Sequence, residues 1–323
     1  MQRIDASQFA ALRHAFAALA ACSDAGPAGT MIQDSGRPGP TVGITAMTHG
    51  NEPAGLAAWD ALTRRAPLAL LKGRVVWVLN NLKAAERYFA LPFEAPFPDK
   101  QRTRAFDLNM NRLPRDLTAR ARGEAYEIDR SLDLLPVWRS FDVGLDIHTT
   151  SQSEPPMLCV TAATDPALYR GFPAEDVILG FDTAARDAVV LNYFGKPGAA
   201  SQCFSVEAGG HEDAASWRTA TMAVRILLAN LGMAAPLETR PMPRRLYRLS
   251  GGVFFPAPDY AMVEIFPNFA PIRAGAVLAR GQGPDLVAPH DGHVLMCPKS
   301  GRLSDIREEA VFLSAPVEAL AAA

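Results

Sequence analysis

Several uninterrupted apolar runs, separated by stretches with helical periodicity, constrain the fold of this chain more than any other feature. Such runs are typical of strands that are buried on both faces, which occur mainly in parallel sheets covered by helices. The runs lie at residues 41–47, 74–80, 142–147, 157–161 and 203–207. Stretches with helical periodicity lie at about residues 53–66, 120–140, 175–189 and 212–232. The pattern predicts an α/β fold with a mixed, largely parallel central sheet and helices on both faces.

The composition of the chain changes near residue 235. A proline-rich linker covers residues 236–243, and glycine- and proline-rich turns separate the short strand-like pieces that follow it, as in small all-β domains. These pieces include residues 260–266 and 293–296. We therefore expect an α/β domain at residues 1–235 and an all-β domain at residues 240–323 that caps the cleft of the first.

Two other regions lack the periodicity of regular structure. Residues 24–40 are rich in Gly, Pro, Ser and Asp, and this composition predicts turns. Residues 83–116 contain four prolines and several arginines with little periodicity. They predict a long irregular loop, of the kind that is usually functional or disordered.

The N-terminal segment has the pattern of an amphipathic helix. Its apolar residues recur at helical spacing: Phe9, Leu12, Phe16 and Leu19. Residues 19–22 resemble a lipoprotein cleavage box, but Asp5, Arg13 and His14 interrupt the apolar region that a signal peptide requires. The sequence has no window of about 20 uncharged apolar residues, so we predict no membrane span and expect a cytoplasmic location.

Charge and cysteine usage exclude several classes of partner and site. The net charge is -2, and no block of Lys or Arg is present, so the electrostatic footprint of a protein that binds nucleic acid or anionic lipid is missing. The four cysteines are scattered and form no CxxC pair. This spacing predicts buried thiols of a reducing compartment rather than disulfides or a zinc-thiolate site.

A His-Gly-Asn-Glu segment follows the first apolar run and precedes a helix-like run. His49 and Glu52 lie three residues apart, so both side chains can face one point near the start of the helix. The apolar run at residues 142–147 ends at His148. Ligands of open α/β sheets bind at the carboxyl ends of the strands. Two histidines and one carboxylate, with the fourth position left to water, form the ligand set of catalytic zinc.

These features also have structural interpretations. A carboxylate at a helix N-terminus, as in the His49 and Glu52 segment, commonly stabilises the helix dipole. Asp146 is equally compatible with orienting the strand end that carries His148 and with being a buried structural carboxylate. The presence of His148 at a second strand end favours the metal site.

A third strand end carries another carboxylate. Glu207 closes the apolar run at residues 203–207, and two glycines follow it. Near zinc, this side chain could take a proton from water and pass it to a leaving amine. The alternative is a charged residue satisfied in a turn. His211 either lines the pocket or lies at the surface near a helix N-terminus, and we favour the surface.

The arginine-rich region offers groups that recognise anions. Asn111 and Arg112 suit a carboxylate, because a guanidinium binds it bidentately, and Arg104 lies shortly before them. The alternative is a turn capped by Asn with a solvated Arg. Lys196 and Arg218 flank the Glu207 region and are candidates for a second substrate carboxylate.

The His-Asp-Gly-His segment at residues 290–293 has two interpretations. It has residue types that bind metals, and it contains Asp-Gly, the strongest short signal for a hairpin turn. We favour the turn.

Four motifs occur in the order and approximate spacing of a known family: His49–Glu52, Asn111–Arg112, Asp146–Thr149 and Val206–Glu207. In these motifs the chain resembles the succinylglutamate desuccinylase/aspartoacylase family, a branch of the zinc carboxypeptidase superfamily. Residues 268–279 are similar to the β-domain of that family, most closely to that of the desuccinylases. The resemblance therefore runs from about residue 40 to about residue 315.

The resemblance implies a zinc carboxypeptidase-like fold, one zinc ion, and hydrolysis of the amide bond of a small N-acyl amino acid. It implies these roles: His49, Glu52 and His148 as zinc ligands, Asn111 and Arg112 as a clamp for a substrate carboxylate, Glu207 as general base and acid, and Arg104 as an aid at the polarised carbonyl.

The chain departs from the family pattern at two places. The family reads Asp-Leu-Asn-Arg, whereas residues 107–112 read Asp-Leu-Asn-Met-Asn-Arg. We assign the clamp to Asn111 and Arg112 because the pair must be adjacent, and Asn109 is a second candidate for substrate contact. The C-terminal Tyr of aspartoacylases has no counterpart in residues 301–307, which argues against an aspartoacylase specifically.

Two alternative functions use the same fold. A carboxypeptidase-like zinc metallopeptidase would share the metal site, although a capping β-domain would restrict the cleft to small substrates. A non-catalytic zinc-binding protein would require the loss of a ligand or of Glu207, and none is missing. The sequence leaves the acyl group and the amino acid open and is compatible with a homo-oligomer.

Overall fold

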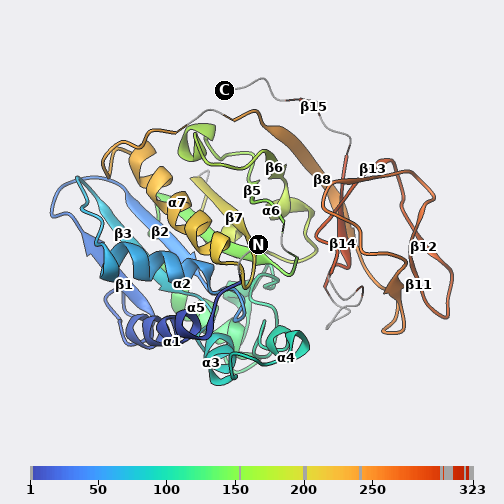
Figure 1. Ribbon diagram of the computed structural model, residues 1–323, viewed down its shortest axis with the longest axis horizontal. Coiled ribbons are helices and arrows are strands. Elements are labelled where there is room, and N and C mark those ends of the chain that lie inside the picture. Colours follow the sequence, from blue (N-terminus) through green and yellow to red (C-terminus); the bar gives the residue numbers. More distant parts are fainter. Residues whose placement is uncertain are drawn as a thin grey trace.

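A twelve-stranded sheet forms the centre of the computed structural model, which describes residues 3–152, 154–198, 202–239, 242–298, 301, 308–315 and 318–319 (Figure 1). Four parallel strands lie side by side in its middle. In spatial order they are β3 (Arg74–Leu79), β2 (Thr41–Ala46), β4 (Val143–Thr150) and β7 (Gln202–Gly210). Residues of these strands are almost entirely buried, which confirms the largely parallel sheet expected from the apolar runs.

Three strands flank this parallel core. The edge strand β1 (Thr30–Asp34) pairs antiparallel with β3, β5 (Met157–Val160) pairs antiparallel with β7, and β6 (Asp176–Leu179) pairs parallel with β5. The turns predicted for residues 24–40 are therefore wrong for β1. A half-exposed edge strand with polar residues lacks the continuous apolar run by which the buried strands were recognised.

The helix predicted for residues 175–189 is also wrong. This segment begins with β6, turns at Gly180, where φ is 109°, and continues as the short helix α6 (Phe181–Ala184). Val177 and Ile178 are β-branched and fully buried, so sheet pairing decides their conformation over a weak helical pattern.

Helices cover both faces of the sheet. One hydrophobic core contains the apolar faces of α1 (Ala6–Ala20), α2 (Ala54–Trp59) and α7 (Ala214–Asn230), and a second core on the other face contains that of α5 (Tyr126–Trp138). Helix α2 continues as a π-helical turn over Asp60–Arg65. Phe9, Leu12, Phe16 and Leu19 are all buried, which confirms the amphipathic helix at the N-terminus. Of the helices that the structure describes, none combines the length and apolar character that crossing a membrane requires.

The region predicted as a long irregular loop contains two helices, α3 (Leu82–Ala90) and α4 (Phe97–Gln101). The side chain of Asn81 caps α3 by accepting a hydrogen bond from the backbone N–H of Ala84. Tyr88 and Phe89 pack against aromatic rings of α1, and this tertiary contact stabilises a helix too short to be recognised by its periodicity. Short 3₁₀ turns lie at Leu117–Ala119, Pro166–Tyr169 and Val190–Tyr193.

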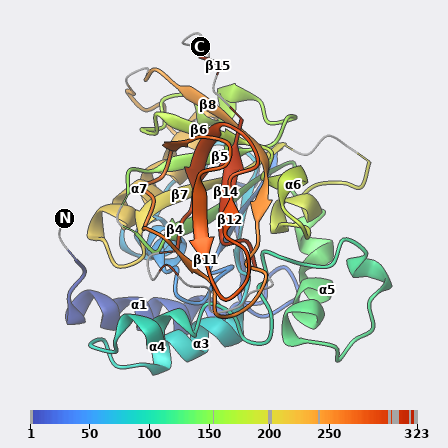
Figure 2. The same ribbon diagram turned by 90° about the vertical axis from the view of Figure 1, so that its right-hand side faces the viewer.

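The C-terminal segment is built from strands, as expected. Strand β8 (Arg245–Val253) pairs parallel with β6 and antiparallel with the first of three further strands of the large sheet. These are β14 (Val311–Ser314), β13 (Gly292–Leu295) and β10 (Ala270–Ile272), and β15 (Glu318–Ala319) pairs with the start of β8. A separate small sheet contains β12 (Leu286–Val287), β11 (Val277–Arg280) and β9 (Ala261–Met262). Figures 1 and 2 show this part at one end of the long axis of the molecule.

The predicted division into domains at residues 235 and 240 stays a prediction. Strand β8 lies between β6 and β14, so one sheet includes strands from both predicted domains. The strand predicted at residues 260–266 is wrong beyond β9, since the strand ends at Met262 and the chain bends at residues 263 and 264. Residues 290 and 291 form a bend between β12 and β13, which belong to different sheets, so this turn does not close a two-stranded hairpin.

Candidate metal centre and its cavity

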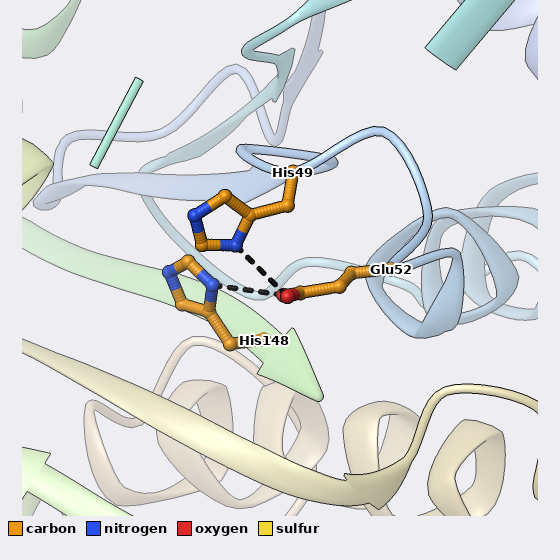
Figure 3. Close-up of side chains that lie close together, drawn as sticks. All are labelled: His49, Glu52 and His148. Carbon is orange, nitrogen blue, oxygen red and sulfur yellow. Dashed lines mark hydrogen bonds and ion pairs between the residues drawn. The ribbon is translucent and has the colours of Figure 1, made fainter. Parts of the chain in front are cut away.

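The three residues predicted as metal ligands converge at the carboxyl ends of neighbouring strands. His49 and Glu52 follow β2, and His148 lies in the adjacent parallel strand β4. One Glu52 carboxylate oxygen lies 2.9 Å from His49 Nδ1, and the other lies 3.0 Å from His148 Nδ1. Figure 3 shows both imidazole rings with one nitrogen directed at the Glu52 carboxylate. All three side chains are buried.

The outward nitrogen of each imidazole contacts an acceptor. His49 Nε2 lies 2.9 Å from Asn109 Oδ1, and His148 Nε2 lies 2.6 Å from Asp146 Oδ2. An imidazole that donates its Nε2–H to these oxygens presents the lone pair of Nδ1 to the centre of the cluster. This is the arrangement in which histidines bind metal ions, because the second hydrogen bond fixes the ring and its tautomer.

The donor set fits a divalent cation. The ligand atoms of His49, Glu52 and His148 all lie within 4.8 Å of one another, the one such group found among the residues that the structure describes. Burial lowers the pKa of His49, and the nearby Arg104 lowers it further, which favours the neutral ring that metals require. Burial opposes ionisation of Glu52, but His49 and His148 outweigh it and hold the pKa of this carboxyl well below its usual value.

Asp146 has a firmly held position behind His148. It is buried, and its Oδ1 accepts hydrogen bonds from the hydroxyls of Thr45 and Thr48, at 2.6 and 2.9 Å. Although burial disfavours a charged imidazole, the Asp146 carboxylate raises the pKa of His148 well above its usual value. Of the two interpretations of Asp146, its contact with His148 supports the orienting one.

Close backbone contacts shape the corner that carries His49. Met47 adopts a positive φ of 54°, which turns the chain sharply as it leaves β2. The N–H of Gly50 donates to the carbonyl of Arg104 at 3.0 Å. A Cβ at Gly50 would lie 2.3 Å from the carbonyl oxygen of Thr103, so only glycine fits where the metal-ligand loop touches the arginine-rich segment.

Arg104 and Arg112 of that segment both reach the site. Arg104 Nη1 donates to Glu52 Oε1 at 2.8 Å, and its Nε lies 3.9 Å from Glu308 Oε2. Arg112 Nε donates to Glu309 Oε2 at 2.7 Å. The solvated arginine considered as an alternative for Arg112 is therefore wrong, since its side chain is only 16% exposed.

The two asparagines near Arg112 differ in their surroundings. Asn111 lines the cavity, and its Oδ1 accepts a hydrogen bond from the backbone N–H of Val190. Asn109 is buried behind His49, and its Oδ1 also accepts from the N–H of Asn111 at 2.8 Å. Asn109 is not among the residues that line the cavity, so its placement does not support the direct substrate contact considered for it.

Glu207 lies beside the three candidate metal ligands. In the register of β4 and β7 it stands directly opposite His148, so both side chains project from the same face of the sheet. Its Oε2 is enclosed and has no hydrogen-bond partner among the described residues. Burial raises the pKa of Glu207 to about 8, with His148 opposing that effect. A half-buried carboxyl with a raised pKa is suited to proton transfer near neutral pH.

A cavity of about 390 Å³ contains these groups. His49, Glu52, His148, Glu207, Arg104 and Arg112 line one part of it, and Met296, Pro298 and residues 308–310 from the C-terminal segment line another. His211 is buried, lines the cavity and contacts Thr149 Oγ1 at 2.7 Å, so the surface position that we favoured for it is wrong. Lys196 and Arg218 are exposed and do not line the cavity.

Sequence reasoning missed the acidic pair Glu308 and Glu309. Two glutamates before an apolar strand read as ordinary solvent-exposed residues, and no local pattern places them beside Arg104 and Arg112. Residues 302–307, where a counterpart of the aspartoacylase Tyr was sought, lie outside the residues that the structure describes.

Comparison with known proteins decides the family. The model of the succinylglutamate desuccinylase/aspartoacylase catalytic domain matches residues 38–229, more than half of the chain. The chain belongs to the succinylglutamate desuccinylase/aspartoacylase family. The match covers all the predicted site residues, from His49 to Glu207, and it confirms the resemblance inferred from the four motifs.

Several solved structures share the fold. A succinylglutamate desuccinylase from Vibrio cholerae is 16% identical, with a TM-score of 0.64 over 89% of this chain and 85% of that one. A succinylglutamate desuccinylase/aspartoacylase from Rhodobacter sphaeroides is 18% identical, with a TM-score of 0.58 over 88% and 87%. The product-bound ectoine utilization protein EutE (DoeB) from Ruegeria pomeroyi is 17% identical, with a TM-score of 0.57 over 89% and 88%. No curated protein matches the sequence.

The contact between Asn109 and His49 leads to a prediction for this family member. Replacing Asn109 with Leu is expected to weaken zinc binding by about 10- to 100-fold, because the ring of His49 loses the acceptor that orients it. Replacing it with Asp should preserve the affinity, since Asp keeps the acceptor and carries no amide N–H, and Asn109 Nδ2 lacks a partner among the described residues. Competition with a fluorescent zinc chelator measures both variants. Equal affinities for the Leu and Asp variants would contradict the orienting role.

The raised pKa of Glu207 predicts a pH dependence of stability. Because the folded protein holds this proton more tightly than the unfolded chain, the stabilisation is complete below about pH 4.5 and is lost as the pH rises through about 8. In metal-free protein, the free energy of unfolding should therefore fall more steeply with rising pH in the wild type than in Glu207→Gln. Urea unfolding at a series of pH values tests this, and parallel profiles for the two proteins would refute it.

Proposed function

We propose that this chain is a zinc-dependent hydrolase that cleaves the amide bond of a small N-acyl amino acid. The observation that carries the proposal is the convergence of His49, Glu52 and His148 on one point of a cavity, with Glu207 beside them. Membership of the succinylglutamate desuccinylase/aspartoacylase family supports the same chemistry.

His49, Glu52 and His148 would hold the ion through two imidazole nitrogens and a carboxylate, which leaves one coordination position open. Zinc bound there supplies a Lewis acid that polarises a carbonyl group and lowers the pKa of water to about 7. Asn109 and Asp146 hold the two imidazole rings in the orientation that this binding requires.

Glu207 performs the proton transfers of the proposed reaction. Its carboxylate takes a proton from the attacking water as a C–O bond forms at the acyl carbon. It then gives this proton to the nitrogen as the C–N bond breaks, so that the products are a carboxylic acid and a free amine. A carboxyl that is partly enclosed, with an unpartnered oxygen, can exchange a proton in both directions near neutral pH.

Arg104 and Arg112 supply positive charge to the same cavity. Arg104 contacts Glu52, beside the proposed metal position, and we assign its guanidinium to stabilising the negative charge that develops on the acyl oxygen. Arg112 and Asn111 line the cavity farther along the same segment, and we assign them to positioning the amino-acid part of the substrate.

The shape of the cavity favours this function over a peptidase. Residues from the C-terminal strands and the loops before them close one side of the cavity, whose volume suits a small molecule better than an extended peptide. The cytoplasmic location and homo-oligomer formation considered above stay predictions.

A screen of zinc-loaded protein over N-succinyl, N-acetyl and other N-acyl amino acids tests the proposal. Release of a free amine, detected with a primary-amine reagent, is expected for at least one substrate and should disappear after the zinc is removed by a chelator. Hydrolysis of C-terminal peptide bonds instead would favour the carboxypeptidase-like alternative. Stoichiometric zinc with no hydrolysis of either class would favour a non-catalytic zinc-binding protein.

A further inference from the structure

The cavity contains an ion pair that bears on which substrates it accepts. Arg112 Nε donates to Glu309 Oε2 at 2.7 Å, and the side chains are 16% and 1% exposed. Arg112 Nη1 also donates to the carbonyl oxygen of Asn111 at 2.6 Å. The guanidinium that would bind a substrate carboxylate therefore already has a carboxylate partner from the protein itself.

Glu309 is held firmly in this position. Its Oε1 accepts a hydrogen bond from the backbone N–H of Arg186 at 3.1 Å. The next residue, Ala310, donates its N–H to the carbonyl of Val253 in β8 at 2.7 Å. Gly252 of β8 makes room for the stem of the glutamate, because a Cβ there would lie 2.3 Å from Glu309 Cγ. With these contacts the Glu309 side chain forms part of the cavity wall.

The other charges that line the cavity also leave little positive charge for a substrate carboxylate. The lining contains three arginines and five carboxylates: Arg102, Arg104, Arg112, Glu52, Asp146, Glu207, Glu308 and Glu309. With Glu207 ionised, as the proposed reaction requires, a divalent ion at the predicted metal site would balance the two excess negative charges. No surplus positive charge then remains for a substrate with several carboxylates, and Lys196 and Arg218 lie outside the cavity.

The surroundings of the Arg112 and Glu309 pair are apolar on one side. The Arg112 guanidinium lies 5.6 Å from the centre of the Phe312 ring, which packs edge-on against Phe181. Val189 and Leu191 line the same cavity. A carboxylate moved into these surroundings would lose hydration without gaining an unpaired cation, which is unfavourable.

We propose that Glu309 makes this site selective for N-acyl amino acids with an uncharged side chain and causes it to discriminate against N-acyl dicarboxylic amino acids. This inference rests on the proposed N-acyl amino acid hydrolase function and specifies its substrate class. Glu309 acts by taking the Nε of Arg112 and by repelling a second substrate carboxylate, while Nη2 of Arg112, which has no hydrogen-bond partner among the described residues, stays available to the α-carboxylate that all these substrates share.

Matched pairs of substrates test this selectivity. N-acetyl-L-asparagine and N-acetyl-L-aspartate have nearly the same size and differ by one negative charge, as do N-acetyl-L-glutamine and N-acetyl-L-glutamate. Wild-type zinc-loaded protein is expected to show a kcat/KM at least about tenfold higher for the amide of each pair, because placing like charges side by side is costly. In Glu309→Gln this ratio should fall by about tenfold or more, mainly through a lower KM for the acid.

Binding measurements separate this inference from the proposed function. Isothermal titration calorimetry with the zinc-loaded Glu207→Gln variant compares the affinity of each acid and amide without turnover. Addition of Glu309→Gln to that variant should tighten binding of the acids relative to the amides. If no compound of the screen is hydrolysed, the proposed function is wrong. The calorimetric affinities for the acids and amides still test whether Glu309 makes the site selective.

Three results would overturn the selectivity. They are a wild-type preference for the acids, a ratio that does not change in Glu309→Gln, and failure of all four compounds to bind. Glu309→Ala serves as a second variant because it removes the charge without placing an amide N–H beside Arg186, and thermal unfolding checks that both variants are folded.

Discussion

Replacing Glu207 with Gln is expected to lower kcat for the best N-acyl amino acid by about 10²–10⁴-fold while zinc remains bound. Gln has nearly the same shape as Glu and cannot take a proton from water. The proposed ligands His49 and His148 lie on other elements and keep their contacts with Asn109 and Asp146. Rates of amine release and zinc content, measured on the same preparation, check both parts of this expectation.

Glu86→Gln is a matched control for this variant. Glu86 lies on the exposed side of α3, so the same chemical change there should leave both rate and zinc content as in the wild type. A Glu207→Gln variant that turns over at nearly the wild-type rate would reject Glu207 as the proton-transfer residue. Loss of zinc from this variant would indicate that Glu207 also supports the metal site.

Replacing Glu52 with Gln is expected to abolish stoichiometric zinc binding and to destabilise the metal-free fold. The Glu52 carboxylate contacts His49, His148 and Arg104, and it also accepts a hydrogen bond from the backbone N–H of Thr149. Removal of one member of a buried ionic cluster leaves the others uncompensated, which typically costs about 3–5 kcal/mol. The zinc-loaded wild type gains further stability from bound metal, and the variant should not.

Thermal unfolding with and without added zinc, together with metal analysis, measures this expectation. Wild-type protein should unfold at a higher temperature when zinc is added, and the Glu52→Gln variant should show no such shift. Glu86→Gln again serves as the control for a change from Glu to Gln that lies away from the cluster. One zinc per chain in Glu52→Gln, with an unchanged unfolding temperature, would refute the assignment of Glu52 as a ligand.

The buried strands and the residues that meet at their carboxyl ends could be predicted because their signals are local. The strands β2, β4 and β7 are continuous apolar runs. A polar residue at the end of such a run therefore indicates a functional site. His49, His148 and Glu207 each occupy such a position, and parallel pairing brings the ends of adjacent strands to one edge. Placement of the three residues together therefore followed from topology that the sequence pattern already indicated.

The edge strand β1, the strand β6 and the helix α3 were missed for a common physical reason. Each is short, and each is stabilised mainly by its neighbours: β1 by pairing with β3, β6 by lying between β5 and β8, and α3 by packing on α1. Local propensity is too weak a signal in segments of this length, and tertiary contacts override it.

The sequence by itself determined the type of fold and the family and predicted which residues form the candidate metal site, because these depend on periodicity and on motifs a few residues long. Only the tertiary structure decided which partners the polar side chains of the cavity have. Asn109 meets His49 across 60 residues of sequence, and Glu309 meets Arg112 across 197. No local pattern encodes such pairs, since they form where distant segments cross and burial requires each polar group to find a partner.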